Sequence, residues 1–380
     1  MPTPHTPHPA GNVQFTDARP PKPTEPPRTE TPPIQEVGTA MQLTEQESQP
    51  IPTMGWQATW YNVKKAFNKG ARIPALSQRE IAILQAQEAE RQRLQNRADG
   101  IKLLNALSDE VKSLTVAFIG VKGAAGTTTT TAHAASVAGD LTRSALVASD
   151  FNPASGTLAP RLGKDFDQTT TLRELRGDIE GFKNFKDFIA KIRPTRYSVR
   201  PISANDIVSG SQHLTNEDAE IMLQTIDSNT EYHYIDTAND ITDPVTLAAV
   251  QAADVLVFTA YVGIHDSLRQ LAIGMETLRQ HGFKDKVNTS VVVISGAPKG
   301  ADLSTYHKYL NRVNIRDEVI QQYHFEGPFL HIPYDEVIRR DTEVDLEALD
   351  PDTYQAYLEL NIAIFEQSPR HREFREFPTS

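Results

Sequence analysis

The chain has 380 residues, a formal net charge of −11 at pH 7 and no cysteine, which excludes a disulfide framework, a thiolate metal site and a catalytic thiol. No apolar run approaches the 18 residues of a membrane span, and the first residues lack the basic flank and apolar core of a secretory signal. We therefore expect a cytoplasmic protein that is at most peripheral at a membrane.

Residues 1–53 are expected to form a disordered tail. They hold 13 of the 25 prolines and too few apolar side chains to offset the entropy of ordering. The PxP and PP steps favour extended polyproline II stretches on which a protein partner could dock, and the alternative is a plain solvated tail.

Residues 54–113 are expected to form a helical linker that begins with an amphipathic segment. Trp56 and Trp60 share one face at helical spacing, beside several lysines and an arginine. Such a helix suits the groove of a protein partner or an anionic membrane surface. The alternative is that its apolar face docks on the chain's own domain.

A second linker helix is predicted over residues 77–97. Ser77 and Glu80 form a capping box, and the residues that follow are strong helix formers with too few apolar positions for a coiled coil. We expect a solvated helix that ends at Asp99-Gly100.

Residues 114–135 combine a strand, a small-residue loop and the start of a helix. The apolar run 114–120 predicts a buried parallel strand. The helix N-terminus that follows presents unpaired N–H groups and a positive dipole end, which suit a phosphate. The candidate phosphate-binding residues are Gly123, Ala124, Ala125, Gly126, Thr127, Thr128 and Thr129.

The loop departs from the standard P-loop pattern GxxxxGK[ST], which would need glycine at Val121 and lysine at Thr127. It resembles the deviant Walker A loop, KGGxGKTT, of MinD/ParA-type ATPases. The resemblance implies that Lys122 is the signature lysine, which reaches a phosphate across a dimer and acts in catalysis, and that Thr128 holds Mg²⁺. The alternative is a tight strand-to-helix turn without a ligand.

A second predicted strand, 144–150, ends at Asp150. The MinD/ParA family has a DxD sequence here, and its second acid positions the attacking water. The resemblance therefore makes Asp150 and Asn152 the candidate catalytic residues. Because the amide of Asn152 cannot accept a proton, we expect slow or absent hydrolysis.

Later strands complete the candidate site. Strand 232–236 ends in Asp236, as a Walker B strand does, so Asp236 is expected to hold the Mg²⁺ shell with Thr128. Ser295 stands where the family has an asparagine that reads adenine, and Pro333 lies in an IPYD stretch that matches the family. Both are candidate nucleotide-binding residues.

Strands and helices alternate through residues 114–368, which indicates an α/β fold with a doubly wound, mostly parallel sheet and a ligand at the carboxyl ends of the strands. Residues 369–380 are expected to be a C-terminal tail. The further strands are expected near 199–204, 255–261, 290–294 and 327–335, and the helices near 172–192, 216–228, 264–281, 303–313 and 351–365.

The resemblance implies an ATP- and Mg²⁺-dependent switch that forms a homodimer and acts in positioning, partition or secretion-system assembly. Stretches 150–161 and 243–249 resemble ParA-like ATPases of actinobacterial type VII secretion. A second hypothesis is a degenerate scaffold that binds a protein partner through its N-terminal segment. A third, a DNA-binding partition ATPase, is disfavoured because residues 114–380 hold 25 basic and 37 acidic residues.

Overall fold

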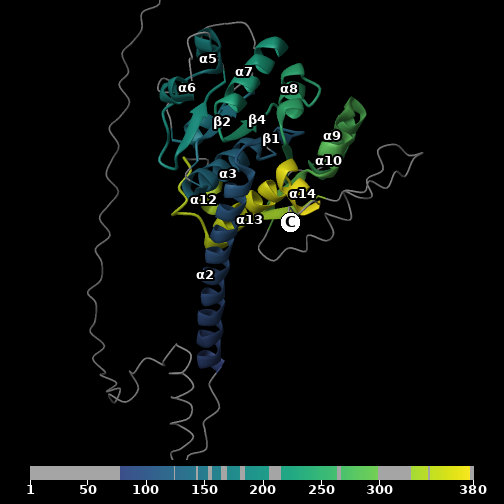
Figure 1. Ribbon diagram of the computed structural model, residues 1–380. Helices are drawn as coiled ribbons and strands as arrows, with labels where there is room; N and C mark the ends of the chain where they lie inside the picture. The colour runs from purple at the N-terminus through teal and green to yellow at the C-terminus, as the bar shows by residue number, and fades with distance from the viewer. Residues whose placement is uncertain are drawn as a thin grey trace, which may run out of the picture. The chain divides into compact units, whose positions relative to one another are not determined.

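The computed structural model describes residues 78–123, 125–142, 144–152, 156–163, 169–179, 185–204, 215–262, 267–297, 327–340 and 343–376. All of them belong to one compact unit, Ser77–Ser380 (Figure 1). The predictions for the tail, the Trp56 and Trp60 segment, the Ser77 cap, Ala124 and the helix at 303–313 lie outside the described residues.

Seven parallel strands form one sheet in the order β3-β2-β4-β1-β5-β6-β7. The predicted α/β class with a doubly wound parallel sheet is therefore confirmed. The strands are β1 (Leu114–Gly120), β2 (Leu146–Asp150), β3 (Val199–Ile202), β4 (Tyr232–Asp236), β5 (Val255–Tyr261), β6 (Val291–Ala297) and β7 (Phe329–Pro333).

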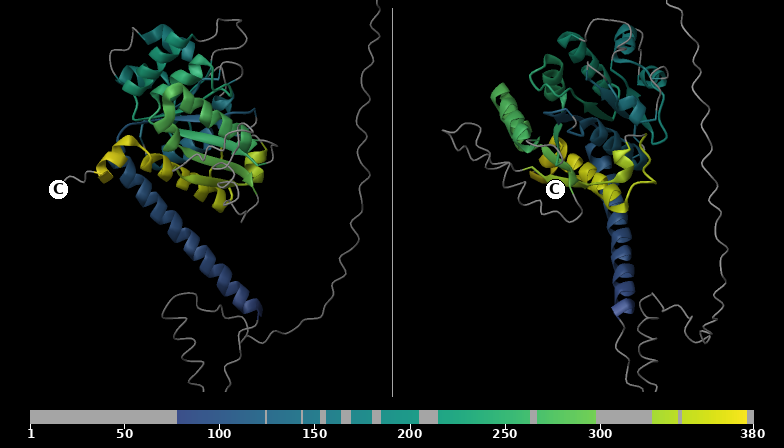
Figure 2. Two further views of the ribbon diagram at one scale, coloured as in Figure 1. Left: turned by 90° about the vertical axis from the view of Figure 1, so that its right-hand side faces the viewer. Right: turned by 180° about the vertical axis from the view of Figure 1, so that it is seen from behind.

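Both faces of the sheet are buried, as expected when every strand is parallel. In β1, Val116 and Phe118 pack into one core cluster, while Ala117 and Ile119 pack into another on the opposite face. The first face is covered by α3 (Thr127–Thr142), α13 (Pro351–Glu366) and the second half of α2 (Gln78–Val111). The opposite face is covered by α5 (Leu172–Asp178), α6 (Phe185–Lys191), α7 (Asn216–Ser228), α8 (Pro244–Ala252), α9 (Ser267–Leu278) and α10 (Lys284–Asn288) (Figure 2).

The predicted end of the linker helix at Asp99-Gly100 is wrong, because α2 continues through Gly100 to Val111. A Cβ atom at Gly100 would lie 2.9 Å from Leu358 Cδ2, so glycine lets α2 approach α13 closely. Leu104, Leu107 and Val111 are buried in the core beyond this point. Packing thus outweighs the low helix propensity of glycine.

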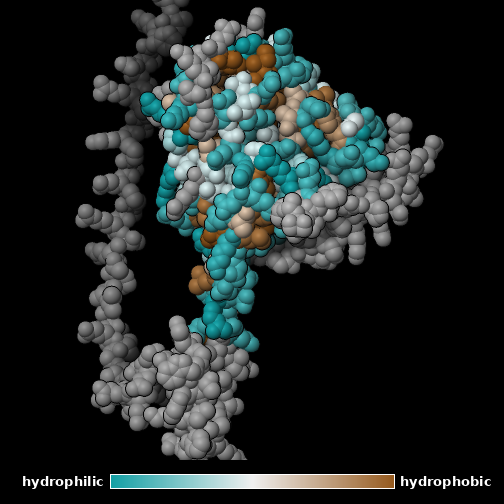
Figure 3. Space-filling view, viewed as in Figure 1, coloured by the Kyte–Doolittle hydropathy of each residue, from teal (hydrophilic) through white to brown (hydrophobic). Residues whose placement is uncertain are grey.

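Upstream of Gly100 the helix is solvated, as predicted. Residues 85–99 are all exposed, and Figure 3 shows this part of α2 as mostly hydrophilic. Among the described helices, none is both long and apolar enough to cross a membrane.

The expected C-terminal tail is in part a further helix, α14 (Pro369–Glu376). His371 Nδ1 lies 2.8 Å from Glu110 Oε1, and Arg370 Nη1 donates to the carbonyl of Val111 at 3.3 Å. Both contacts tie α14 to the end of α2. The prediction of a tail is therefore wrong for residues 369–376.

Two other predicted helices are divided. The segment 172–192 contains α5 and α6 separately. The helix predicted to end at Gly282 ends as α9 at Leu278, and a short π-helical turn then carries the chain through Gly282 into α10. Gly282 has a φ of 95°, which glycine adopts without strain.

Candidate functional site

The first residue of α3 is anchored to the sheet rather than turned to solvent. Thr127 is 6% exposed, and its Oγ1 lies 2.9 Å from Thr259 Oγ1 of β5. A Cβ atom at Gly120 would collide with the Thr127 hydroxyl, so glycine is required at the end of β1. Threonine carries no charge, so Thr127 cannot make the charged contact of a P-loop lysine, and its hydroxyl is bonded to β5.

The loop between β1 and α3 is closed by backbone hydrogen bonds. Ala125 N donates to Lys122 O at 3.1 Å, and Thr130 N donates to Gly126 O at 2.8 Å. Gly126 has a φ of +82°, a left-handed conformation that favours glycine. Lys122 and Gly123 lie on the solvent side of the loop. The loop thus has a fixed inner half and a lysine on its outer half.

The structure brings the two predicted metal ligands together. A hydrogen bond from the Thr128 side chain favours the ionised form of Asp236. Asp236 is 1% exposed, and its Oδ1 accepts no hydrogen bond from the described residues. A buried carboxylate oxygen beside a hydroxyl fits a hard divalent cation.

Such a cation would need most of its ligands from elsewhere. Among the described residues, no group of three or more His, Asp or Glu side chains could hold a metal ion. Mg²⁺ commonly takes one or two protein ligands and completes its shell with water and phosphate oxygens. The pair of Thr128 and Asp236 fits that pattern.

Asp150 lies directly beside Asp236 in the ladder between β2 and β4. Burial raises the pKa of Asp150 to about 6. Burial, together with the nearby Asp150 charge, also raises the pKa of Asp236 well above its usual value. Two adjacent buried carboxyl groups cannot both ionise without cost unless a cation is present.

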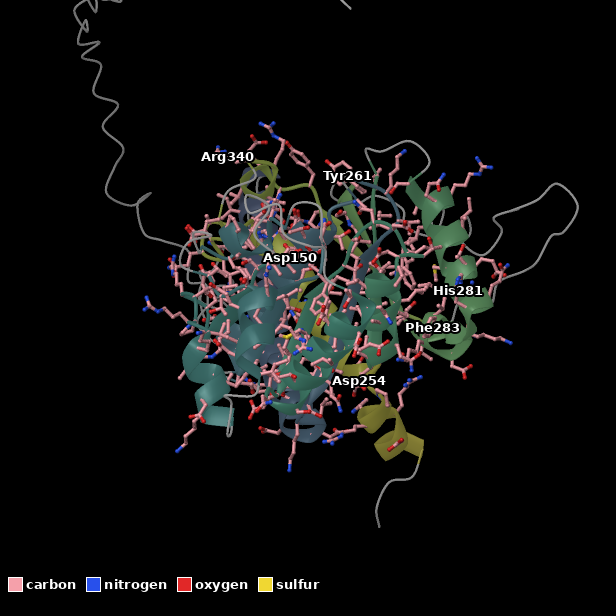
Figure 4. All side chains as sticks on the ribbon, turned by 90° about the horizontal axis from the view of Figure 1, so that it is seen from above. Asp150, Asp254, Tyr261, His281, Phe283 and Arg340 are labelled. Carbon is pink, nitrogen blue, oxygen red and sulfur yellow. The ribbon has the colours of Figure 1, made fainter. Side chains whose placement is uncertain are left out.

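The carboxyl oxygens of Asp150 hold the segment that follows β2. Oδ1 accepts from Asn152 N at 3.0 Å, and Oδ2 accepts from Leu158 N at 3.1 Å. Leu158 begins the short helix α4 (Leu158–Arg161). The structure thus joins the two predicted catalytic residues Asp150 and Asn152 through the backbone, and Figure 4 shows Asp150 inside the molecule.

A pocket of about 380 Å³ opens beside the first turn of α3. It brings together four residues predicted from the sequence, and does not include Lys122 or Gly123. Tyr261, in the pocket wall, ends β5, and Asp254 precedes that strand. Figure 4 shows the two residues on opposite sides of the view. The predicted residues in the wall are Gly126, Thr129, Ser295 and Pro333, and the residues not predicted from the sequence include Thr130, Arg161, Tyr261, Gly296, Tyr334, Arg339 and Tyr357.

Ser295 contributes a hydroxyl to this pocket. Its Oγ donates to the carbonyl of Ala260 at 3.3 Å, so its lone pairs remain able to accept from a ligand. The hydroxyl of Ser295 can therefore contact a base, but it does not offer the paired donor and acceptor of an asparagine amide.

Asp335, of the IPYD stretch, connects the pocket wall to α13. Its Oδ1 accepts from Val337 N at 2.8 Å and caps α12 (Glu336–Arg339), and its Oδ2 accepts from Asp350 N at 2.9 Å. Asp350 in turn is the N-cap of α13. The match to the IPYD pattern thus has a structural basis in these helix starts.

His133 packs behind the pocket. Its ring stacks on Tyr357 at a centroid distance of 5.1 Å, and its Nδ1 donates to Thr129 O at 2.8 Å. Burial lowers its pKa to about 4, so the ring is neutral at pH 7 and supports the first turn of α3.

A second polar cluster lies within the sheet, away from the pocket. His233 Nε2 is 2.6 Å from Ser149 Oγ, and His233 Nδ1 is 2.7 Å from Asp227 Oδ1. The order of groups is that of a serine hydrolase triad. Ser149 and His233 are fully buried, however, so this cluster stabilises the contact between β2, β4 and α7.

Comparison with known proteins places this geometry in context. No family model matches the chain. The chain is 26% identical over 263 residues to the ESX-1 secretion-associated protein EspI of Mycobacterium tuberculosis, in strains CDC 1551 / Oshkosh and H37Rv. The match covers 68% of this chain and 37% of EspI, so the chain spans little more than a third of that relative's length.

Similar solved structures include ParA- and MinD-type ATPases, the class that the sequence resembles. A ParA family ATPase from Chlorobium tepidum is 14% identical, covers 70% of this chain and 93% of its own, and has a TM-score of 0.48. MinD from Pyrococcus furiosus is 17% identical, with coverages of 67% and 100% and a TM-score of 0.48. The ATP complex of a Cyanothece McdA variant is 16% identical, with coverages of 67% and 96% and a TM-score of 0.49.

Proposed function

We propose that the chain is a Mg²⁺-dependent nucleotide-binding switch whose hydrolysis is slow or absent. One observation carries this proposal: the closed loop before α3, the pair of Thr128 and Asp236, and the pocket of about 380 Å³ adjoin one another at the carboxyl ends of the strands. Parallel α/β sheets bind ligands at this edge. The chemistry of the loop suits a phosphate, that of the pair of Thr128 and Asp236 suits a hard cation, and that of the pocket suits a nucleobase.

Each part has a role in this proposal. The backbone N–H groups of Gly123 and of Gly126 to Thr128 would bind the phosphates, together with Lys122. Thr128 and Asp236 would hold Mg²⁺, which neutralises phosphate charge. The pocket would hold the nucleoside of ATP, with Ser295 and Pro333 in its wall.

We expect slow hydrolysis on the grounds of two residues. Asn152 has an amide that cannot accept a proton. Thr127 replaces the P-loop lysine and bonds to β5 instead.

A degenerate scaffold that binds no nucleotide is the second candidate. The specific observation in its favour is the buried bond of Thr127 to Thr259, because loss of the lysine removes a charge-assisted contact typically worth about 1.5 to 3 kcal/mol. In this case the N-terminal segment would bind the partner and the α/β unit would only present it. DNA binding ranks third because of the acidic balance of residues 114–380.

The partner and the setting are part of the proposal. Lys122 lies on the open side of the loop, where a second copy of the chain could meet it in a nucleotide-dependent homodimer. Similarity to the secretion-associated EspI favours secretion-system assembly over plasmid partition. We place the protein in the cytoplasm, with contact to a membrane or a protein partner through the Trp56 and Trp60 segment.

The test is equilibrium binding of a fluorescent ATP analogue to the full chain, with Mg²⁺ and with EDTA. We expect micromolar affinity that needs Mg²⁺, a loss of at least about tenfold in Lys122→Ala, and phosphate release much slower than nucleotide exchange. Lys112→Ala, which removes a lysine outside the site, is the matched control. If the folded chain binds no analogue at millimolar concentration, the nucleotide-binding switch is refuted and the scaffold hypothesis stands.

A further inference from the structure

The positive charges of the pocket are few. Among the described residues in its wall, two are cationic, Arg161 and Arg339. Arg339 donates to both carboxylate oxygens of Glu336, at 2.6 and 2.9 Å, and this pair is largely exposed. The charge of Arg339 is therefore offset by an acid of its own helix.

Arg161 lies at the end of α4. Leu158 starts this helix with the hydrogen bond to Asp150 Oδ2, and Leu158 and Ala159 are buried. At the other end, the Arg161 carbonyl accepts from Val344 N at 2.8 Å. The Arg161 backbone is thus fixed at both sides, and the half-buried side chain lines the pocket.

Arg161 lies on the side of the pocket that the loop and α3 form. Its side chain shares the pocket wall with Gly126 of the loop and with Thr129 and Thr130 in the first turn of α3. Burial lowers the pKa of His133, and the Arg161 charge lowers it further.

The same region lacks the usual cation at Thr127, whose side chain is bonded to β5. A nucleotide in the pocket would bring several negative charges to the first turn of α3, where Gly126, Thr129 and Thr130 share the pocket wall with Arg161. A guanidinium at this place can form paired hydrogen bonds to phosphate oxygens.

We propose that Arg161 binds the phosphates of the nucleotide and supplies, from α4, the positive charge that a P-loop lysine would supply from the position of Thr127. This inference rests on the proposed nucleotide site and names a phosphate-binding residue within it. It also gives a second role to the Asp150 carboxylate: by binding Leu158 N, it positions the helix that carries Arg161.

The experiment measures dissociation constants of the full chain for adenosine, AMP, ADP and ATP with Mg²⁺, by competition with a fluorescent ATP analogue. In Arg161→Gln we expect affinity for ADP and ATP to fall at least about tenfold, while affinity for adenosine stays within about twofold. Arg161→Lys keeps the charge but not the paired hydrogen-bond geometry. Its affinity for ADP and ATP should lie between those of the wild type and Arg161→Gln.

Arg340→Gln is the matched control. Arg340 follows α12, is exposed and lies at the periphery in Figure 4, so this substitution removes the same charge outside the pocket. We expect less than a twofold change for every ligand. Thermal unfolding without nucleotide shows which variants are folded. If Arg161→Gln is not folded, Arg161→Met, which retains the aliphatic stem, replaces it.

The outcomes separate this inference from the function on which it rests. If the wild-type chain binds none of the four ligands, the nucleotide site itself is wrong. If the wild type binds ATP and folded Arg161→Gln binds it equally well, the role of Arg161 is overturned while the nucleotide site stands. An equal loss for adenosine and ATP would also overturn it, because Arg161 would then shape the pocket rather than bind phosphate.

Discussion

The hydroxyl oxygens of Thr127 and Thr259 lie 2.9 Å apart, one on the first residue of α3 and the other inside β5. Thr259 also donates to the Ile119 carbonyl at 3.3 Å, so the hydrogen bonds join β1, β5 and α3. The side chain at position 127, where the standard P-loop pattern has a lysine, is part of the core in this protein.

The first prediction concerns this bond. Thr127→Val keeps the shape of the side chain and removes its hydroxyl, so we expect a loss of about 1 kcal/mol in the free energy of unfolding and nucleotide affinity within about twofold of the wild type. Chemical denaturation and analogue binding measure the two effects. Thr277→Val, in α9, is the control for a threonine outside the site. A tenfold change in affinity with unchanged stability would contradict the structural role of Thr127.

The second prediction concerns acid pH and His133. The folded pKa of about 4 lies below the unfolded value of about 6.5, so the unfolded chain binds the proton first as the pH falls. Stability from this group is present above about pH 6.5 and is lost towards pH 4. Relative to His133→Phe, the wild type should lose up to about 3 kcal/mol over this range. A pH-independent difference in urea unfolding between the two proteins would exclude this effect.

The third prediction concerns the buried carboxyl pair. Burial and the Asp150 charge raise the folded pKa of Asp236, so the stability that its neutral carboxyl supplies to the metal-free protein is lost as the pH rises from the unfolded pKa of about 3.9 towards the higher folded pKa. Without metal at pH 7, Asp236→Asn should unfold at a higher temperature, by roughly 2–4 °C if about 1 kcal/mol is gained. The same variant should lose Mg²⁺-dependent nucleotide binding.

Thermal unfolding in EDTA, repeated at pH 5 and pH 7.5, tests the sign of the pH dependence. The stability advantage of Asp236→Asn over the wild type should grow with pH, opposite to the effect of His133. Asp240→Asn, in the exposed loop after β4, is the control. An Asp236→Asn protein that is less stable than the wild type at pH 7.5 without metal would refute the prediction.

The fourth prediction separates the two halves of α2. Leu107 is 3% exposed and lies in the core, whereas Leu94 on the same helix is 60% exposed. Leu107→Ala should cost about 2 to 5 kcal/mol, and Leu94→Ala less than about 0.5 kcal/mol. Equal effects in urea unfolding would show that the two halves of α2 do not differ in their packing.

The strands could be predicted from the sequence because each is a short apolar run whose signal is local. β1 and β4 have the predicted bounds, and the acids at strand ends led directly to Asp150 and Asp236. The continuation of α2 through Gly100 could not be predicted, because it depends on Leu358, which is distant in the sequence.

The candidate site divides in the same way. Residues whose spacing matches a loop pattern, such as Gly126 and Thr128, were found from the sequence. Arg161 and Tyr261 were not, because only the folded sheet brings α4, β5 and α3 to one pocket. The bond of Thr127 to Thr259 spans 132 positions, and no local signal indicates it.

The 34-residue helix α2 has a mechanical consequence. The wall residue Asp335 binds the N-cap of α13 at Asp350, and Asp352, in the first turn of α13, forms an ion pair of 3.0 Å with Arg93 of α2. Residues 78–92, upstream of Arg93, extend for about 22 Å at 1.5 Å per residue. Because Leu104, Leu107 and Val111 fix the second half of this continuous helix in the core, a force on its exposed half would act directly on the α/β unit.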